Sequence, residues 1–327
     1  MTSGSNYILK KDEIDKIFSF FSKKGVSSFK KIKDGIINDS YFIMDKDNNK
    51  YVLRIYISGK VTKNIDFEID TMNFLTKKSI PIPLLHKTLK EQKYYLGLNL
   101  KNKKRFIVLM DFVEGYHLKS SDLKMINEVA TIQSKMHLLL KKSKSKKAGQ
   151  LGINSVFKWA GSEFNQAIKK PGIDINVKNQ ILNIAQELFI QKKSILKNAL
   201  APIGYVHYDY DSNNIIIKNN KVKGIIDFDD LTESLFVVDL GFSLWWWMYF
   251  NQDKIHEILK KYLSAYQKVR KLSKQEQGLL IFFIRMRNLI LMCLLFVNIS
   301  PKVEKQKIKK CIALDNLLKE TKTQHLF

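Results

Sequence analysis

The sequence predicts an α+β protein whose strands are concentrated in the N-terminal third and whose helices fill most of the rest. Short β-branched and aromatic runs, separated by polar turns, recur between residues 29 and 112. From residue 123 onward, apolar side chains recur mainly every three to four positions, which is the period of an amphipathic helix. The 327 residues are enough for two lobes of ordinary domain size with a well-buried core.

The N-terminal part is predicted to contain two helices and five strands. The helices span residues 9–22 and 63–78, where apolar residues are spaced by three and four. Pro81 ends the second helix, because proline disfavours helical geometry at itself and at the residue before it. The predicted strands cover residues 29–37, 41–44, 51–56, 94–100 and 105–112.

The C-terminal part is predicted to be mainly helical. A lysine-rich run at residues 141–147 indicates a solvated loop between two helical segments. Three short apolar runs at 204–206, 215–217 and 222–226 indicate strands. The predicted helices cover residues 123–140, two stretches within 153–200 that are split near Pro171, and then 235–250, 253–270, 274–298 and 301–321.

The composition indicates a folded protein with a basic surface. Apolar residues make up 45% of the chain, and the net charge is +25. Only five of the 56 basic residues are arginine, the usual side chain for bidentate recognition of bases and phosphates. Specific binding of nucleic acid is therefore not expected, although charge alone predicts a weak attraction to anionic surfaces.

Two features favour a cytoplasmic protein without a membrane span. The first residues lack the apolar core of a signal peptide, so Cys293 and Cys311 are expected to be reduced thiols. Residues 279–299 are long and apolar enough to cross a bilayer, but Arg285 and Arg287 lie near their centre. Those charges favour a buried helix instead.

A polar stretch between residues 207 and 230 carries the candidate chemistry. It reads His-Tyr-Asp-Tyr-Asp-Ser-Asn-Asn from His207, and Ile-Asp-Phe-Asp-Asp follows from Ile226. Asp209, Asn214 and Asp227 lie at the ends of the short predicted strands. Phosphoryl transfer needs such a set: a carboxylate for the acceptor hydroxyl, and an amide and a second carboxylate for magnesium on the nucleotide phosphates.

The spacing His-x-Asp-x-x-x-x-Asn, followed by Ile-Asp-Phe with its aspartate thirteen residues after Asn214, resembles the aminoglycoside phosphotransferase and choline kinase family. The resemblance implies a two-lobed protein-kinase-like fold, with a small antiparallel-sheet N-lobe and a larger, mainly helical C-lobe. It implies a nucleotide-binding lobe at 1–110, a connector at 111–115 and a catalytic, acceptor-binding lobe at 116–327 with a helical insert at about 153–200.

The resemblance also implies roles for the residues of the motif. Asp209 would be the catalytic carboxylate, and Asn214 and Asp227 would hold the magnesium ion on the nucleotide. His207 would be a scaffold residue of the loop. Asp239, in Val-Val-Asp-Leu-Gly, would be the downstream structural aspartate of the family.

A second set of residues is implied in nucleotide binding. Arg54 takes the place of the strand lysine that contacts the phosphates, with an ordinary outward strand residue as the alternative reading. Glu68 would form an ion pair with Arg54, and Asp66 is the second choice for that pair. The remaining candidates are Gly35, Asn38 and Ser40 in a loop over the phosphates, and Met110, Asp111 and Val113 in the connector, where backbone groups would bind adenine.

The residues near the acceptor leave its identity open. A polycationic aminoglycoside calls for an acidic pocket, whereas aromatic faces suit ammonium groups through cation–π attraction. Core packing is the alternative for the indoles of residues 245–247. The candidate acceptor residues are Asp211, Asp229, Asp230 and Glu233, the indoles Trp245 and Trp246, and Trp159 and Glu163 in the insert.

The sequence thus predicts an enzyme, an ATP- or GTP-dependent phosphotransferase that uses Mg²⁺ to move the γ-phosphate to a hydroxyl of a small molecule, as aminoglycoside phosphotransferases do. Metabolic amino alcohols of the choline or homoserine type are alternative acceptors. A protein kinase and an inactive nucleotide-binding module are the alternatives from other classes. Asp229, which replaces the glycine of the protein-kinase Asp-Phe-Gly, argues against the first, and the intact motif argues against the second.

Overall fold

The computed structural model describes residues 8–32, 38–56, 62–98, 104–142, 146–170, 174–197, 200–298 and 301–321. The chain divides into two compact units, and the mixed helical and strand content predicted from the sequence is confirmed. Unit 1 comprises Met1–Tyr116, Ile216–Lys218 and Lys223–Asp229, and unit 2 comprises His117–Ile215, Asn219–Val222 and Asp230–Phe327. Unit 1 thus includes a segment from far along the sequence. The predicted lobe limits stay a prediction.

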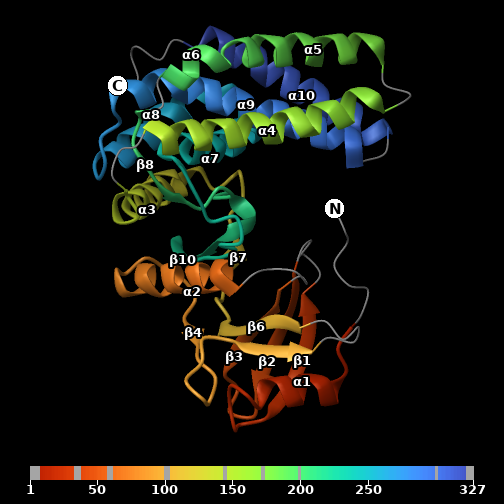
Figure 1. Cartoon of the computed structure of the whole chain (residues 1–327), viewed down its shortest axis with the longest axis vertical. Coiled ribbons are helices and arrows are strands. Elements are labelled where there is room, and N and C mark those ends of the chain that lie inside the picture. Colours follow the sequence, from red (N-terminus) through yellow and green to blue (C-terminus); the bar gives the residue numbers. More distant parts are fainter. Residues whose placement is uncertain are drawn as a thin grey trace. The chain divides into compact units, whose positions relative to one another are not determined.

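Unit 1 is built on a six-stranded antiparallel sheet (Figure 1). Its order is β1-β2-β3-β6-β4, and β5 also pairs with β6. Burial alternates along β2, so that Tyr41 and Ile43 face the same apolar cluster, as the period of a strand requires. The strands are β1 (Val26–Ile32), β2 (Asp39–Asp45), β3 (Lys50–Ile55), β4 (Leu85–His86), β5 (Tyr95–Leu98) and β6 (Lys104–Asp111).

Two helices complete the apolar clusters of unit 1. Helix α1 (Lys11–Phe18) buries Ile14 and Phe18 in the cluster that contains Tyr41 and Ile43. Helix α2 (Thr62–Lys77) contributes Ile65 and Ile69 to a second cluster, which includes Val108 of β6. Both helices lie where the apolar periodicity predicts them, and each buries its apolar face against the sheet strands.

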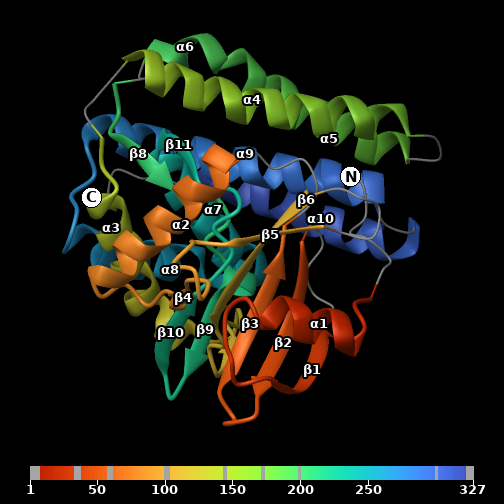
Figure 2. The same ribbon diagram turned by 60° about the horizontal axis from the view of Figure 1, so that its bottom comes forward.

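Unit 2 is mainly helical, and α9 lies at its centre. This helix packs against α4, α5, α7 and α10, which lie beside one another in Figures 1 and 2. Its apolar window is 78% buried, in agreement with the predicted buried helix. The helices are α3 (Ile126–Leu139), α4 (Lys146–Lys169), α5 (Ile175–Ile190), α6 (Lys192–Lys197), α7 (Phe236–Phe250), α8 (Ile255–Gln267), α9 (Lys274–Asn298) and α10 (Pro301–Glu320).

The structure differs from the sequence prediction at the start of α4, at α6, which is a third helix where two were predicted, and at three short strands. Helix α4 begins at Lys146, inside the lysine run that was expected to be a loop, because lysine is a good helix former. The short strands β4, β7 (Tyr116–His117) and β11 (Thr232–Leu235) were not predicted, since so few residues carry no clear period. The remaining strands are β8 (Ile203–Val206), β9 (Ile215–Lys218) and β10 (Lys221–Ile225). Strand β8 pairs with β11, and β9 pairs with β10 and β7.

Candidate active site

The segment after β8 adopts an unusual backbone conformation. Tyr208 has a φ of 71°, in the left-handed region that costs energy for a residue with a side chain. Its N–H donates to Asp239 Oδ1 at 2.6 Å, and this bond holds the backbone in place. The short 3₁₀ helix Ser212–Asn214 then begins at Asp211, whose side chain accepts from the Asn213 N–H at 2.9 Å. Residues 208–214 therefore form a fixed loop.

Asp209 and Asn214 are brought together by this loop. Asn214 Nδ2 donates to Asp209 Oδ2 and to the Asp209 carbonyl oxygen, each at 2.9 Å. Asn214 is 5% exposed, whereas the Asp209 side chain is 38% exposed. The Asp209 carboxylate is therefore held in one orientation by Asn214 and is still accessible to a ligand. Because the amide nitrogen is occupied, the amide oxygen of Asn214 is the atom that suits a metal ion.

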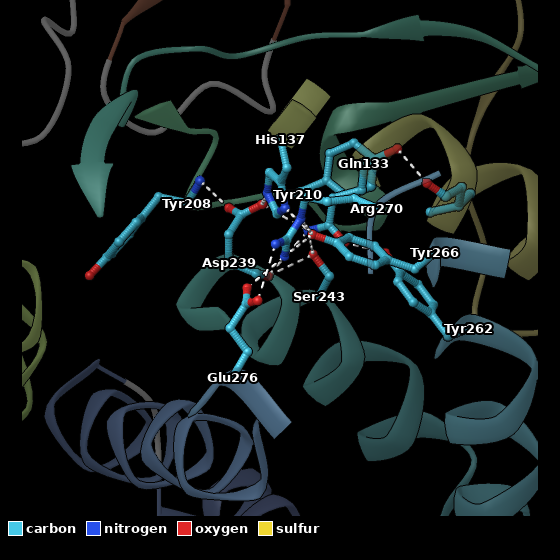
Figure 3. A network of polar contacts seen from close by, with 11 residues as sticks. Gln133, His137, Tyr208, Tyr210, Asp239, Ser243, Tyr262, Tyr266, Arg270 and Glu276 are labelled. Atoms are coloured by element: carbon cyan, nitrogen blue, oxygen red, sulfur yellow. Dashed lines mark hydrogen bonds and ion pairs between the residues drawn. The ribbon is translucent and has the colours of Figure 1, made fainter. Parts of the chain in front are cut away.

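A buried polar network supports the loop from inside unit 2 (Figure 3). Asp239 Oδ2 accepts from Gln133 Nε2 at 2.8 Å and lies 2.9 Å from His137 Nε2, while His137 Nδ1 lies 2.6 Å from the Tyr266 hydroxyl. Burial lowers the pKa of His137. Burial alone would raise the pKa of Asp239, but its hydrogen bonds, first that of His137, bring this pKa below its ordinary value. Asp239 is thus an acceptor that fixes Tyr208.

Arg54 and Asp227 meet in unit 1. Arg54 Nη2 lies 2.7 Å from Asp227 Oδ1 and 3.1 Å from Asp229 Oδ1, and the Asn38 amide donates to Asp229. Asp227 has a φ of 63°, the second left-handed residue of the candidate site. Burial acts to lower the pKa of Arg54, but the two carboxylates raise it well above its ordinary value. The guanidinium is therefore charged and held by two anions.

Glu68 lies close to Arg54, and the predicted ion pair between them stays a prediction. Glu68 is 4% exposed and accepts from the Tyr56 hydroxyl at 2.8 Å, while the Arg54 guanidinium lies over the Tyr56 ring at 5.3 Å. The charge of Glu68 contributes, after those of Asp227 and Asp229, to the raised pKa of Arg54. The second choice, Asp66, lies 3.8 Å from Lys93 instead.

The remaining nucleotide candidates lie in unit 1. Ser40 of β2 is the cross-strand neighbour of Arg54 on β3, whereas Gly35 lies outside the described residues. Met110 belongs to β6, and the Asp111 N–H donates to the Leu84 carbonyl. Val113 has no hydrogen bond to another described residue. The binding of adenine by the predicted connector stays a prediction.

The predicted acceptor carboxylates differ in how they are paired. Burial, and next the charge of Asp209, raise the pKa of Asp211 to about 6. Asp229 is paired with Arg54, and Glu233 lies 2.9 Å from Lys142 Nζ. Asp230 is exposed. Two of the four carboxylates, Asp229 and Glu233, therefore already face a cation of the chain.

The three consecutive indoles of α7 are all buried. Trp245 and Trp246 are each 6% exposed and Trp247 is 1% exposed. Their burial agrees with core packing, the alternative given for these indoles, since α7 is covered on every side from Phe236 to Tyr249. Trp246 packs edge to face on Trp247, and the Trp245 indole N–H donates to Asn288 Oδ1 at 3.1 Å.

Arg287 is a site residue that sequence reasoning missed. Its Nη2 lies 3.3 Å from Asp209 Oδ1, although the two residues are far apart in the sequence. In the sequence, Arg287 indicated only that α9 is not a membrane span. An arginine in a buried apolar helix needs an anionic partner, however, and this requirement could have predicted a contact with an aspartate of the polar motif.

The two-unit fold, with the fixed Asp209–Asn214 pair and the Arg54–Asp227 ion pair, defines a kinase-like phosphotransferase. Residues 28–272 match the family model described as "Phosphotransferase enzyme family". This chain therefore belongs to the phosphotransferase enzyme family. The predicted family, the protein-kinase-like fold and the function as a small-molecule phosphotransferase acting on hydroxyl groups are confirmed.

Similar proteins differ in the acceptor that their names state. A homoserine kinase of Agrobacterium fabrum (strain C58) is 24% identical over 273 residues, which is 82% of this chain and 79% of that protein. The fold matches a microcompartment-associated aminopropanol kinase with a TM-score of 0.71, at 14% identity, over 94% of this chain and 95% of that one. An amicoumacin kinase in complex with AMP-PNP, Ca²⁺ and Ami gives 0.69, at 14% identity, over 96% and 95%.

The Asn214 amide oxygen in unit 2 and the Asp227 carboxylate in unit 1 are each oxygen ligands of the kind that a divalent cation takes, and their binding of one shared ion stays a prediction. The amicoumacin kinase structure contains a nucleotide analogue and a divalent ion, in agreement with the predicted kinds of cofactor. Within the described ranges, no cluster of three or more His, Cys, Asp or Glu residues could hold a metal alone. An ion held by one amide oxygen, one carboxylate and phosphate oxygens needs no such cluster, because Mg²⁺ is commonly bound through one or two carboxylates plus substrate phosphates.

Proposed function

We propose that this protein transfers the γ-phosphate of ATP or GTP, in the presence of Mg²⁺, to a hydroxyl group of a small molecule in the cytoplasm. The observation that carries the proposal is the Asp209 carboxylate, oriented by Asn214 through two hydrogen bonds of 2.9 Å and still 38% exposed. Such a carboxylate can accept a hydrogen bond from an acceptor hydroxyl, orient its oxygen and take its proton late in the transfer.

The other residues of the motif prepare the nucleotide. Asp227 and the Asn214 amide oxygen would hold Mg²⁺, which when bound neutralises charge on the phosphates. Arg54, with Ser40 beside it, would hold phosphate oxygens, while Glu68 keeps the nearby Tyr56 in place. Met110, Asp111 and Val113 would contact the adenine ring. Because Arg54 is paired with Asp227 and Asp229, nucleotide phosphates must compete for its donors.

A metabolic amino-alcohol kinase is the second candidate. The relatives named as homoserine kinases cover 82% of this chain, and the structural similarity to an aminopropanol kinase covers 94% of it. These names favour a small hydroxylated metabolite over an antibiotic. The two acceptors that these names state differ in one group: homoserine carries a carboxylate, and aminopropanol does not.

The test is nucleotide turnover by the purified chain with a panel of hydroxylated acceptors, including homoserine, aminopropanol, choline and an aminoglycoside. We expect turnover that requires an acceptor, is abolished by EDTA and returns with Mg²⁺. Asp209→Asn should lower kcat about 1000-fold, while Asp253→Asn, the same change at an exposed aspartate, should leave kcat unchanged. Acceptor-dependent turnover that persists in Asp209→Asn would refute the assignment of Asp209.

A further inference from the structure

Arg287 lies among aromatic rings beside the candidate catalytic carboxylate, all within unit 2. The centre of its guanidinium is 5.4 Å from the Trp159 ring, 5.1 Å from Phe242 and 5.7 Å from Trp245. The Tyr208 ring packs edge to face on Phe242 at 5.3 Å. These four rings, from α4, α7 and the loop, form what we call the aromatic cage. The cage stabilises the cation through the electron-rich ring faces.

The aromatic cage is already filled by a cation of the chain itself. Aromatic rings around an open space commonly bind quaternary or primary ammonium groups. Here the guanidinium of Arg287 occupies that position, so an ammonium group of an acceptor would meet a like charge. Two positive charges at contact distance repel each other, which disfavours an ammonium group in this position.

Most donors of Arg287 are not used within the described part of the chain. Its one hydrogen bond joins Nη2 to Asp209 Oδ1 at 3.3 Å, longer than the 2.7–2.9 Å typical of a charged pair. A guanidinium offers five N–H donors in a planar fork that matches a carboxylate. The side chain is 17% exposed and is therefore accessible at one edge.

The charges around Asp209 also oppose a polycationic acceptor. Asp209 is paired with Arg287 at 3.3 Å and itself has to accept the hydroxyl, while Glu233 lies 2.9 Å from Lys142 Nζ. An aminoglycoside would thus find Arg287 where it needs an anion.

We propose that the acceptor carries a carboxylate a few bonds from its reactive hydroxyl, and that Arg287 binds this carboxylate while Asp209 binds the hydroxyl. This inference rests on the function proposed above. Hydrogen bonds of about 2.7–2.9 Å to two groups that lie 3.3 Å apart bring the hydroxyl and the carboxylate within about 5–7 Å of each other. The substrate class is a small hydroxy acid or hydroxy amino acid.

The test compares three acceptors that differ in one group at a time. Homoserine carries a hydroxyl, an amine and a carboxylate, 3-aminopropan-1-ol lacks the carboxylate, and 4-hydroxybutanoate lacks the amine. For the wild type, kcat/KM should be at least about 30-fold higher with homoserine than with 3-aminopropan-1-ol, the range expected for a charged hydrogen-bonded pair. For 4-hydroxybutanoate, which has the carboxylate but no amine, kcat/KM should also be well above that of 3-aminopropan-1-ol.

Variants of Arg287 then assign the effect to one side chain. Arg287→Met should lower kcat/KM for the two carboxylates about 30- to 100-fold, mainly through KM, and change that of 3-aminopropan-1-ol less than about threefold. Arg287→Lys keeps the charge but loses the fork, and should give an intermediate loss. Lys260→Met removes the same charge from an exposed position of α8 and should change none of the three values.

Two outcomes would overturn the inference alone. One is a wild type that phosphorylates 3-aminopropan-1-ol, choline or an aminoglycoside at least as well as any carboxylate. The other is an Arg287→Met variant that loses activity equally with all three acceptors, as a merely structural residue would. A complete lack of acceptor-dependent turnover would overturn the proposed function, and this inference with it.

Discussion

Two arginines of α9, two residues apart, are held in opposite ways. Arg285 donates through Nε and Nη2 to Asp315 of α10 at 2.9 and 3.0 Å, and through Nη2 to Glu187 of α5 at 2.7 Å. Arg287 makes one contact of 3.3 Å to Asp209 and otherwise lies against aromatic rings. Nearly opposite sides of one helix thus carry a cation that carboxylates hold through several short hydrogen bonds and a cation most of whose donors make no hydrogen bond within the described residues.

The difference separates a structural arginine from one that can bind a ligand. The chain has only five arginines, and each lies within ion-pair distance of a carboxylate of its own unit. Four of them make at least one contact of 2.5–2.9 Å, as charged hydrogen bonds usually do. Arg287 is the exception.

The largest effect on stability is expected for Arg285, the arginine that carboxylates hold in place. Arg285→Met should lower the free energy of unfolding by about 3–4 kcal/mol, because Asp315 is fully buried and would lose its main partner. Urea unfolding measures this change, with Lys260→Met as the control, which should stay within about 0.5 kcal/mol. If Arg285→Met were as stable as the control, the distinction between the two arginines would fail.

The network behind the loop should give the next largest effect. Arg270 Nη2 donates to Glu276 Oε1 at 2.6 Å, and Glu276 is fully buried (Figure 3). Glu276→Gln keeps the shape but removes the charge that Arg270 faces, and should lower the free energy of unfolding by about 2 kcal/mol. Thermal unfolding tests it. The Glu257→Gln variant, with an exposed pair to Lys261, should change stability by less than about 0.5 kcal/mol.

The sequence predicted the motif well because its chemistry depends on local spacing. Asp209 and Asn214 meet within one loop, and the helices of unit 2 follow from apolar periodicity. Arg287 and the Glu68–Tyr56 contact were missed, because they depend on which helix or strand faces which, and periodicity does not determine that. For the indoles the sequence left an acceptor role and core packing both open, since a helix covered on all sides has no polar face to orient it.

A pH titration sharpens the comparison, because the charge of Arg287 acts on Asp211. The pKa of Asp211 is raised to about 6 in the folded protein, chiefly by burial, and Arg287 lowers it slightly. A carboxyl with a raised folded pKa binds more protons when folded, so wild-type stability falls as pH rises between about 4 and 6. Asp211→Asn should therefore be about 1–2 kcal/mol more stable than the wild type at pH 7, and equal to it below pH 4.

The control for this titration is the same pair of measurements in Arg287→Met. Without the guanidinium, the pKa of Asp211 should rise further, so the stability difference should still begin near pH 4 but level off at a higher pH and reach a larger value. Urea unfolding at several pH values measures both effects. A stability difference between wild type and Asp211→Asn that does not depend on pH would show that the carboxyl is not perturbed in the folded protein.

The smallest effect on stability is expected for Arg287 itself. Arg287→Met loses a long contact to a partly exposed carboxylate and a cation–π interaction, and should lower the free energy of unfolding by about 1 kcal/mol or less. This value is a fraction of that for Arg285→Met, although both variants remove one positive charge from the same helix. If the acceptor selectivity changes strongly while stability hardly does, the charge of Arg287 has been kept for a ligand and not for the fold. A loss of stability as large as that of Arg285→Met would instead make Arg287 a structural counter-ion of Asp209.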